Sequence, residues 1–117
     1  MHGNLNSVRC FVDTKDIMRA YWLAATKCRF GEAYNIGGSC IRSVREVLRA
    51  MWQQIVTPSP LFICEPDPSL MRPADVTMQV PDCSKFKEET GWTEHFDMDK
   101  VLRELLEHYR SELNLSK

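Results

Sequence analysis

The strongest constraint on the fold is an amphipathic helix pattern that begins at Ser43 and stops at Pro58 and Pro60. Ser43 and Glu46 form a capping-box signature, because the serine hydroxyl can accept from the Glu46 amide and the glutamate can reach back to the serine amide. Apolar residues then recur at helical spacing. A helix with one apolar face must pack on another element, so this pattern predicts a chain with a core. The apolar positions are Val44, Val47, Leu48, Met51, Trp52 and Ile55.

The same spacing predicts three further helices. One runs from Asp13 or Thr14 to about Cys28, a short one runs from Asp82 through Phe86 with Gly91 as a left-handed terminator, and the last begins at Asp97. The inward positions are Ile17, Ala20, Tyr21, Ala24 and Cys28 on the first helix, and Met98, Val101, Leu102, Leu105 and Tyr109 on the last.

Three short strands are predicted at residues 7–12, 33–36 and 61–64. In the first of them, Arg9 lies on the face opposite Val8 and Cys10. Residues 65–75 contain three prolines, which is typical of an ordered loop or a linker. The chain therefore has about four helices with short strands. The fold class is mixed α/β (α+β), without a complete β-α-β-α-β series.

Length and charge exclude several classes of protein. A chain of 117 residues is the usual size of one domain. Its net charge of −1 argues against a nucleic-acid binder that works through bulk basic charge. No apolar run reaches the roughly 18 residues of a membrane span, and residues 1–7 do not resemble a secretory signal. Five cysteines without a C-x-x-C pair predict neither a disulfide framework nor a metal site, so we expect a reduced, cytoplasmic protein.

No catalytic motif stands out from the residues themselves, and the three histidines are scattered. Two arginines are more informative: Arg9 on a predicted strand, and Arg72 in the proline-rich loop three residues before Asp75. Guanidinium groups on rigid scaffolds suit the binding of phosphate oxygens, and a nearby carboxylate can accept hydrogen bonds from sugar hydroxyls. Spacing alone leaves the alternative open that both arginines form ordinary surface salt bridges.

Five segments, in order along the chain, resemble the later part of the extended short-chain dehydrogenases/reductases that act on nucleotide sugars. Residues 3–22 are similar to the family pattern G-N-L-x-x-x-R-D-F-x-D-V-x-D-x-x-x-A-Y-W. Within the family, the segments most resemble GDP-mannose 4,6-dehydratase and the GDP-4-keto-6-deoxy-mannose reductases. The remaining four segments are residues 31–37, 43–48, 71–76 and 82–92.

The resemblance implies roles for particular residues. Arg9 and Arg72 match arginines that contact the diphosphate of the nucleotide sugar, and Asp75 matches the acidic position that holds a ribose hydroxyl. Asn4 is expected to line the same pocket. One departure is that Cys10 stands where the family has an aspartate after the arginine, which removes a carboxylate that could orient Arg9.

The resemblance also implies what this sequence lacks. It contains no G-x-x-G-x-x-G cofactor fingerprint and no Tyr-x-x-x-Lys. We therefore expect residues 1–117 to form a nucleotide-sugar substrate-binding domain that lacks the Rossmann half. NADP(H) serves the intact family, but we expect this chain to bind no cofactor and no metal and to have no catalytic residues of its own.

Two functions remain open at this point. The first is a binding domain for a nucleotide sugar of the GDP-mannose type, belonging to an NADP-dependent dehydratase or reductase and inactive alone. The second is a non-enzymatic interaction or assembly module that keeps the fold. In either case a face built to contact the Rossmann half would be exposed, around Met18, Trp22 and the strand at 8–12, which predicts self-association.

Overall fold

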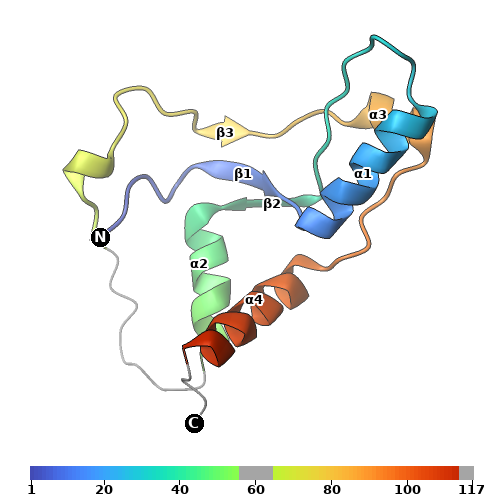
Figure 1. The fold of residues 1–117 in the computed structure, drawn as a ribbon. Helices are drawn as coiled ribbons and strands as arrows, with labels where there is room; N and C mark the ends of the chain where they lie inside the picture. Colours follow the sequence, from blue (N-terminus) through green and yellow to red (C-terminus); the bar gives the residue numbers. More distant parts are fainter. Residues whose placement is uncertain (56–64, 114–117) are drawn as a thin grey trace.

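The computed structural model describes residues 1–55 and 65–113, and it confirms a mixed α/β fold. Four helices and three strands are present in this part of the chain (Figure 1). In chain order they are β1 (Val8–Phe11), α1 (Thr14–Lys27), β2 (Cys40–Ser43), α2 (Val44–Gln53), a 3-10 turn (Pro68–Leu70), β3 (Met78–Gln79), α3 (Ser84–Thr90) and α4 (Met98–Glu112).

The three strands form one small sheet with β1 in the centre and the order β2-β1-β3. Strands β1 and β2 are antiparallel, with Val8 opposite Ser43 and Phe11 opposite Cys40. Strands β1 and β3 are parallel, with Val8 opposite Met78. The parallel pair matters for function, because it carries the residues just before β3 alongside those just before β1.

One of the predicted strands differs from the structure, and another falls on residues that the structure does not describe. Residues 33–36 are not a strand, because this segment has no ladder partner in the described part of the chain. Its half-buried side chains, Tyr34 and Ile36, pack against the core, so the apolar alternation is real although the backbone pairing is absent. The second segment, 61–64, lies outside the described residues. In the described part of the chain, β1 is flanked by β2 and β3, which the sequence pattern did not indicate.

Local capping chemistry defines the helix ends as predicted in most cases. Ser43 and Glu46 make both hydrogen bonds of the capping box at the start of α2. The Asp13 carboxylate accepts from the Lys15 amide at 2.6 Å and caps α1. Gly91 ends α3 with φ +69°, a left-handed conformation that glycine adopts without strain. Helix α3 reaches Thr90, beyond the predicted end at Phe86.

The main core lies where α1 meets α3. Ala20, Phe86 and Trp92 are almost completely buried there, and six partly buried residues surround them: Val12, Leu23, Ala24, Cys28, Tyr34 and Ile36. The prediction that Tyr21 points inward is wrong, since that side chain is exposed. The inward stripe of α1 instead follows Ala20 and Ala24, one position away, and leaves Tyr21 on the outer side.

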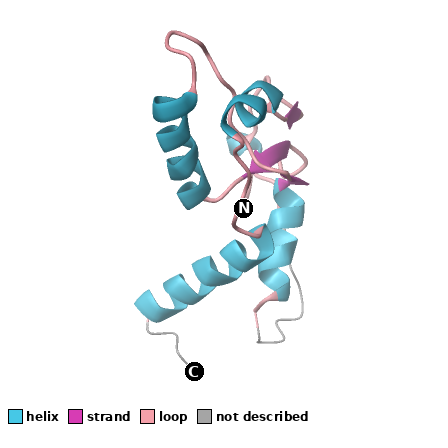
Figure 2. Cartoon of the chain, turned by 90° about the vertical axis from the view of Figure 1, so that its right-hand side faces the viewer, coloured by secondary structure: helices cyan, strands magenta, loops and turns pink. Residues whose placement is uncertain are grey.

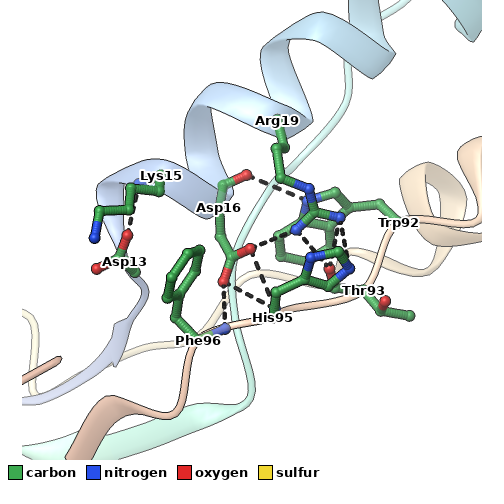
Figure 3. Close-up of polar contacts among 8 residues, drawn as sticks. All are labelled: Asp13, Lys15, Asp16, Arg19, Trp92, Thr93, His95 and Phe96. Carbon is green, nitrogen blue, oxygen red and sulfur yellow. Dashed lines mark hydrogen bonds and ion pairs between the residues drawn. The ribbon is translucent and has the colours of Figure 1, made fainter. Parts of the chain in front are cut away.

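A buried carboxylate joins α1 to the segment that follows α3 (Figure 3). The side chain of Asp16 has no exposed area, and it accepts hydrogen bonds from the backbone amides of His95 and Phe96 at 3.1 Å. Arg19 neutralises it with a 2.6 Å ion pair. The Trp92 indole donates to the Asp16 carbonyl at 3.3 Å. This network fixes residues 92–96 against the first two turns of α1.

Helices α2 and α4 form a second, thinner contact. Met98 and Leu102 of α4 are buried, whereas Leu105 and Tyr109, which were predicted to face inward, are exposed. The described chain is therefore spread out: its extents are 52 × 39 × 19 Å, and its radius of gyration is 17.5 Å. A compact chain of this length has a radius of gyration of about 13 Å. Figures 1 and 2 show the α2–α4 pair extending away from the α1–α3 core.

Candidate functional site

The backbone brings the two ends of the predicted site together. The amide of Val8 donates to the carbonyl of Thr77 at 2.8 Å, at the start of the parallel β1–β3 ladder. Nearer the N-terminus, His2 exchanges backbone hydrogen bonds with Glu65 and Asp67. Residues 2–9 therefore run beside residues 65–79, and Asp75 comes to lie next to residues 4–9.

Asp75 is the centre of the site. Its Oδ2 accepts hydrogen bonds from the Asn4 amide nitrogen and from the Ser7 hydroxyl, both at 2.6 Å. Its Oδ1 is 3.5 Å from a guanidinium nitrogen of Arg9. The Asp75 side chain is 23% exposed, so part of the carboxylate still faces solvent. Two of the three donors bond to Oδ2, and Oδ1 has only the longer contact with Arg9.

The two arginines lie at the same small cavity but are held differently. Arg9 donates to its neighbour's carbonyl, that of Val8, at 2.8 Å and is 28% exposed. Arg72 is exposed, and its charge is close enough to Asp75 to help lower the pKa of that carboxyl. The cavity has a volume of about 290 Å³, and its lining residues are Asn4, Ser7, Arg9, Val44, Leu70, Arg72 and Asp75.

Hydrogen bonding keeps Asp75 ionised. The donors Ser7 and Asn4 hold the pKa of its carboxyl below the usual value, and the positive charges of Arg9 and Arg72 act in the same direction. An ionised carboxylate accepts hydrogen bonds and donates none. The site therefore presents two cations and one fixed acceptor to the cavity.

All four sequence-predicted residues, Asn4, Arg9, Arg72 and Asp75, meet at this one cavity. Sequence reasoning missed Ser7, which is buried and contacts Asp75. A single serine at the edge of a strand carries no signal, so only the parallel register could have identified it. The carboxylate that contacts Arg9 is that of Asp75, at 3.5 Å.

A larger cavity lies elsewhere in the described residues. Its volume is about 720 Å³, and residues 39–42 and 92–98 together with Lys87 form its walls. Arg42 there is paired with Asp99 of α4 at 2.5 Å. The pair is an ordinary ion pair between two elements, and this cavity gathers none of the sequence-predicted site residues.

The strand-to-helix turns of the described chain do not fit a dinucleotide cofactor. A pyrophosphate binds at a helix N-terminus whose backbone amides are free and whose surroundings carry no negative charge. Here the turn before α1 holds Asp13 and the buried Asp16, and the turn before α2 holds Glu46, whose carboxylate occupies the Ser43 amide. Asp82 takes the same place before α3. Carboxylates thus stand where a pyrophosphate would have to bind.

Sequence comparison relates the chain to nucleotide-sugar dehydratases. The family model GDP-mannose 4,6 dehydratase matches residues 1–105. A dTDP-glucose 4,6-dehydratase from Haemophilus influenzae is 30% identical over 116 residues, covering 93% of this chain and 34% of that protein. A dTDP-glucose 4,6-dehydratase from Xanthomonas campestris is 26% identical over 114 residues, with 93% and 32% coverage. The chain thus spans about a third of the length of these curated relatives.

Solved structures agree on the fold. RMD from Pseudomonas aeruginosa, complexed with NADPH, superposes with a TM-score of 0.81 at 21% identity, over 94% of this chain and 35% of that one. UDP-glucose 4-epimerase from Thermotoga maritima, with UDP-glucose, gives 0.78 at 26% identity, over 97% and 35%. Those NADPH and UDP-glucose molecules belong to chains nearly three times as long. With the family model matching residues 1–105, these relationships show that the chain belongs to the GDP-mannose 4,6-dehydratase family of nucleotide-sugar enzymes.

Proposed function

We propose that residues 1–117 form a substrate-binding domain for a nucleotide sugar of the GDP-mannose type. The observation that carries this is the meeting of Asn4, Arg9, Arg72 and Asp75 at one cavity, although about 70 residues separate the two ends of the group. Two guanidinium groups can neutralise a diphosphate, and a fixed carboxylate can accept from a sugar hydroxyl. The matched relatives act on nucleotide sugars, which supports the same ligand class here.

The size of the cavity supports a partial rather than a complete site. Pockets that enclose a small organic ligand usually have volumes of about 300–1,000 Å³. A cavity of 290 Å³ can hold part of a nucleotide sugar but leaves the rest uncovered. In this proposal the remaining wall, the NADP(H) site and the catalytic groups come from the other two thirds of an intact family member. The chain by itself then binds weakly and catalyses nothing.

The proposal is tested by titrating the chain with GDP-mannose and following backbone amide shifts by NMR. The expected result is fast-exchange shifts at residues 4–9 and 72–75, saturating in the millimolar range. Arg72→Ala should weaken them, whereas Arg103→Ala, which removes an exposed arginine on α4, should not. Absence of shifts at millimolar ligand would contradict nucleotide-sugar binding and favour the interaction module. A measurable NADPH-dependent turnover by the chain would contradict its inactivity alone.

The outer face of α1 supports a second part of the proposal, which concerns the partner. Met18 is 53% exposed and Trp22 70% exposed, and with Leu23 and the Arg19 stem they line a shallow, mostly apolar hollow. Figure 2 shows α1 standing at the outside of the molecule. Exposed apolar patches of this kind usually mark association surfaces. We propose that the Rossmann half of a family member covers this face.

In the absence of that half, we expect the chain to associate with itself through the same surface. Light scattering across the micromolar range should show a mass above that of one chain, and Trp22→Glu should return it towards the monomer. Glu88→Ala, on the exposed side of α3, is the control that should leave the mass unchanged. A clean monomer throughout the range would contradict this part of the proposal. Both functions are compatible with the cytoplasm, where we place the protein.

A further inference from the structure

Two cysteine side chains from distant parts of the chain meet beside the backbone of Gly37. A Cβ atom built on Gly37 would lie 3.1 Å from the sulfur of Cys10 and 3.5 Å from the sulfur of Cys83. The two sulfurs are therefore separated by no more than the sum of these distances. The same Cβ atom would lie 2.6 Å from the Pro81 side chain, so the space beside the two sulfurs is closely packed, and Gly37 is itself buried.

Both thiols make hydrogen bonds only to the backbone, and the Gly37 backbone is a further partner of Cys83. The Cys10 thiol donates to the Gly38 carbonyl at 3.2 Å, and the Cys83 thiol donates to the Pro81 carbonyl at 3.6 Å. Thiol hydrogen bonds are weak, so little opposes rotation of either side chain towards the other. A disulfide needs the sulfurs to close to about 2.05 Å, and rotation about the Cα–Cβ bonds of both cysteines moves the two sulfurs towards each other.

The sheet register excludes the nearest competing thiol. In the β1–β2 ladder Cys10 is opposite Ile41, and Phe11 is opposite Cys40. Opposed residues share a face of the sheet, while successive residues alternate between faces. The side chain of Cys40 therefore lies on the face of Phe11, away from Cys10. Within the described residues, no group of three or more His, Cys, Asp or Glu side chains is arranged to hold a metal ion.

We propose that Cys10 and Cys83 form a reversible disulfide that responds to the thiol–disulfide state of the surroundings. The bond would tie β1 to the segment that enters α3. These two segments line a cavity of about 410 Å³ together with Gly37, and Arg9 is one of its lining residues. The bond would then join the strand that carries Arg9 to the segment that leads into α3. The inference is independent of the proposed nucleotide-sugar binding.

The two thiols have different parts in the exchange. Cys10 is partly exposed and lines the cavity, so its thiolate attacks one sulfur of a small-molecule disulfide such as oxidised glutathione. A mixed disulfide forms on Cys10, and one glutathione leaves as its thiolate. Cys83 is only 7% exposed, and burial raises the pKa of its thiol, so it acts second. Its thiolate attacks the Cys10 sulfur and releases the second glutathione, and the two protons lost by the protein end on the two glutathione thiols.

The test is to incubate the full chain with oxidised glutathione and to measure its intact mass and its cross-linked peptides. The expected mass is lower than that of the reduced chain by two hydrogen atoms, with one peptide pair joining Cys10 to Cys83, and dithiothreitol should reverse both changes. Cys83→Ser should instead accumulate glutathione on Cys10, and Cys10→Ser should form no bridge. Cys40→Ser is the matched control and should form the bridge as the unmodified chain does.

Because the joined cysteines are identified on the unmodified chain, the test decides the proposal even if a cysteine variant folds poorly. The proposal is overturned if the oxidised chain carries only mixed disulfides, or if its bridge includes Cys28, Cys40 or Cys64 in place of either proposed residue. It is also overturned if Cys83→Ser loses two hydrogens as readily as the unmodified chain. A bridge between two chains, seen as a dimer on a non-reducing gel, would likewise contradict it.

Discussion

The clearest test of how this fold is held together is removal of the buried carboxylate on α1. Asp16→Ala deletes the acceptor for the backbone amides of His95 and Phe96 and leaves Arg19 without its ion-pair partner (Figure 3). Among the described residues, no other acceptor takes the place of the carboxylate for these two amides. The variant therefore should loosen residues 92–96 from α1, while the helix itself keeps its Asp13 cap.

The expected loss follows from the surroundings of each contact. An amide that loses its buried acceptor costs about 1–3 kcal/mol, and the low end applies here because water can reach the partly exposed 95–96 segment. Arg19 is 36% exposed, so its pair with Asp16 contributes about 1 kcal/mol or less after solvent screening. Together we expect Asp16→Ala to lower the free energy of unfolding by about 3 kcal/mol. That is a large part of the 5–15 kcal/mol that is usual for a domain.

Urea unfolding followed by circular dichroism measures the effect. For a denaturant slope of about 2 kcal/mol/M, the midpoint of Asp16→Ala should fall by about 1.5 M. Glu88→Ala removes the same charge from an exposed position on α3 and should change the stability by less than about 0.5 kcal/mol. If Asp16→Ala unfolds within about 0.5 kcal/mol of the unmodified chain, the carboxylate does not hold these segments together and the reasoning fails.

Three further outcomes are expected. Ser43→Ala removes the capping box of α2 and should cost about 1 kcal/mol in the same urea experiment; an unchanged midpoint would mean that α2 is held by packing alone. Ser7 and Asn4 lower the pKa of Asp75, so its contribution to stability is present above the ordinary carboxyl pKa and is lost as the pH falls through the lower folded value. In Asp75→Asn this acid dependence should shrink, as seen in thermal melts between about pH 2 and 5. The hydrogen bond to Glu89 raises the pKa of Tyr34, so its contribution is present below the ordinary tyrosine pKa and is lost as the pH rises through the folded value; ultraviolet titration should show one late-ionising tyrosine that disappears in Tyr34→Phe.

Sequence patterns predicted the helix caps and ends, which depend on residues close together in the chain. They missed strand pairs, which depend on segments far apart in the chain. The capping box at Ser43, the Asp13 cap and the Gly91 terminator each need contacts within a few residues, and the structure contains all three. Strand β3 has only two residues and exists because it lies beside β1. The segment around Tyr34 alternates apolar and polar residues as a strand does, but it has no neighbouring strand to pair with in the described chain. The predicted strand at 33–36 is therefore not formed.

The burial of a helical side chain could be predicted only where another element packs against that part of the helix. On α4, Met98 and Leu102 are buried at the end that meets the rest of the chain, while Leu105 and Tyr109 continue the same stripe into solvent. The periodicity correctly identifies an apolar face, but it cannot say how far along the helix the covering element extends.

The sequence could identify the residues of the candidate site but not how they lie relative to one another. The resemblance points to individual positions, whereas the fold sets the distances between their side chains. The parallel register places Ser7 and Asn4 on one oxygen of Asp75 and Arg9 near the other.

A carboxylate has about four lone-pair positions. Oδ2 is therefore fully used by protein donors, whereas Oδ1 has one long contact and can accept from a ligand hydroxyl. That same Oδ1 is also the carboxylate oxygen that Arg9 contacts. A ligand that engages Oδ1 and draws Arg9 towards a phosphate would satisfy both groups at once, which favours a ligand carrying a hydroxyl and a phosphate close together over one carrying either alone.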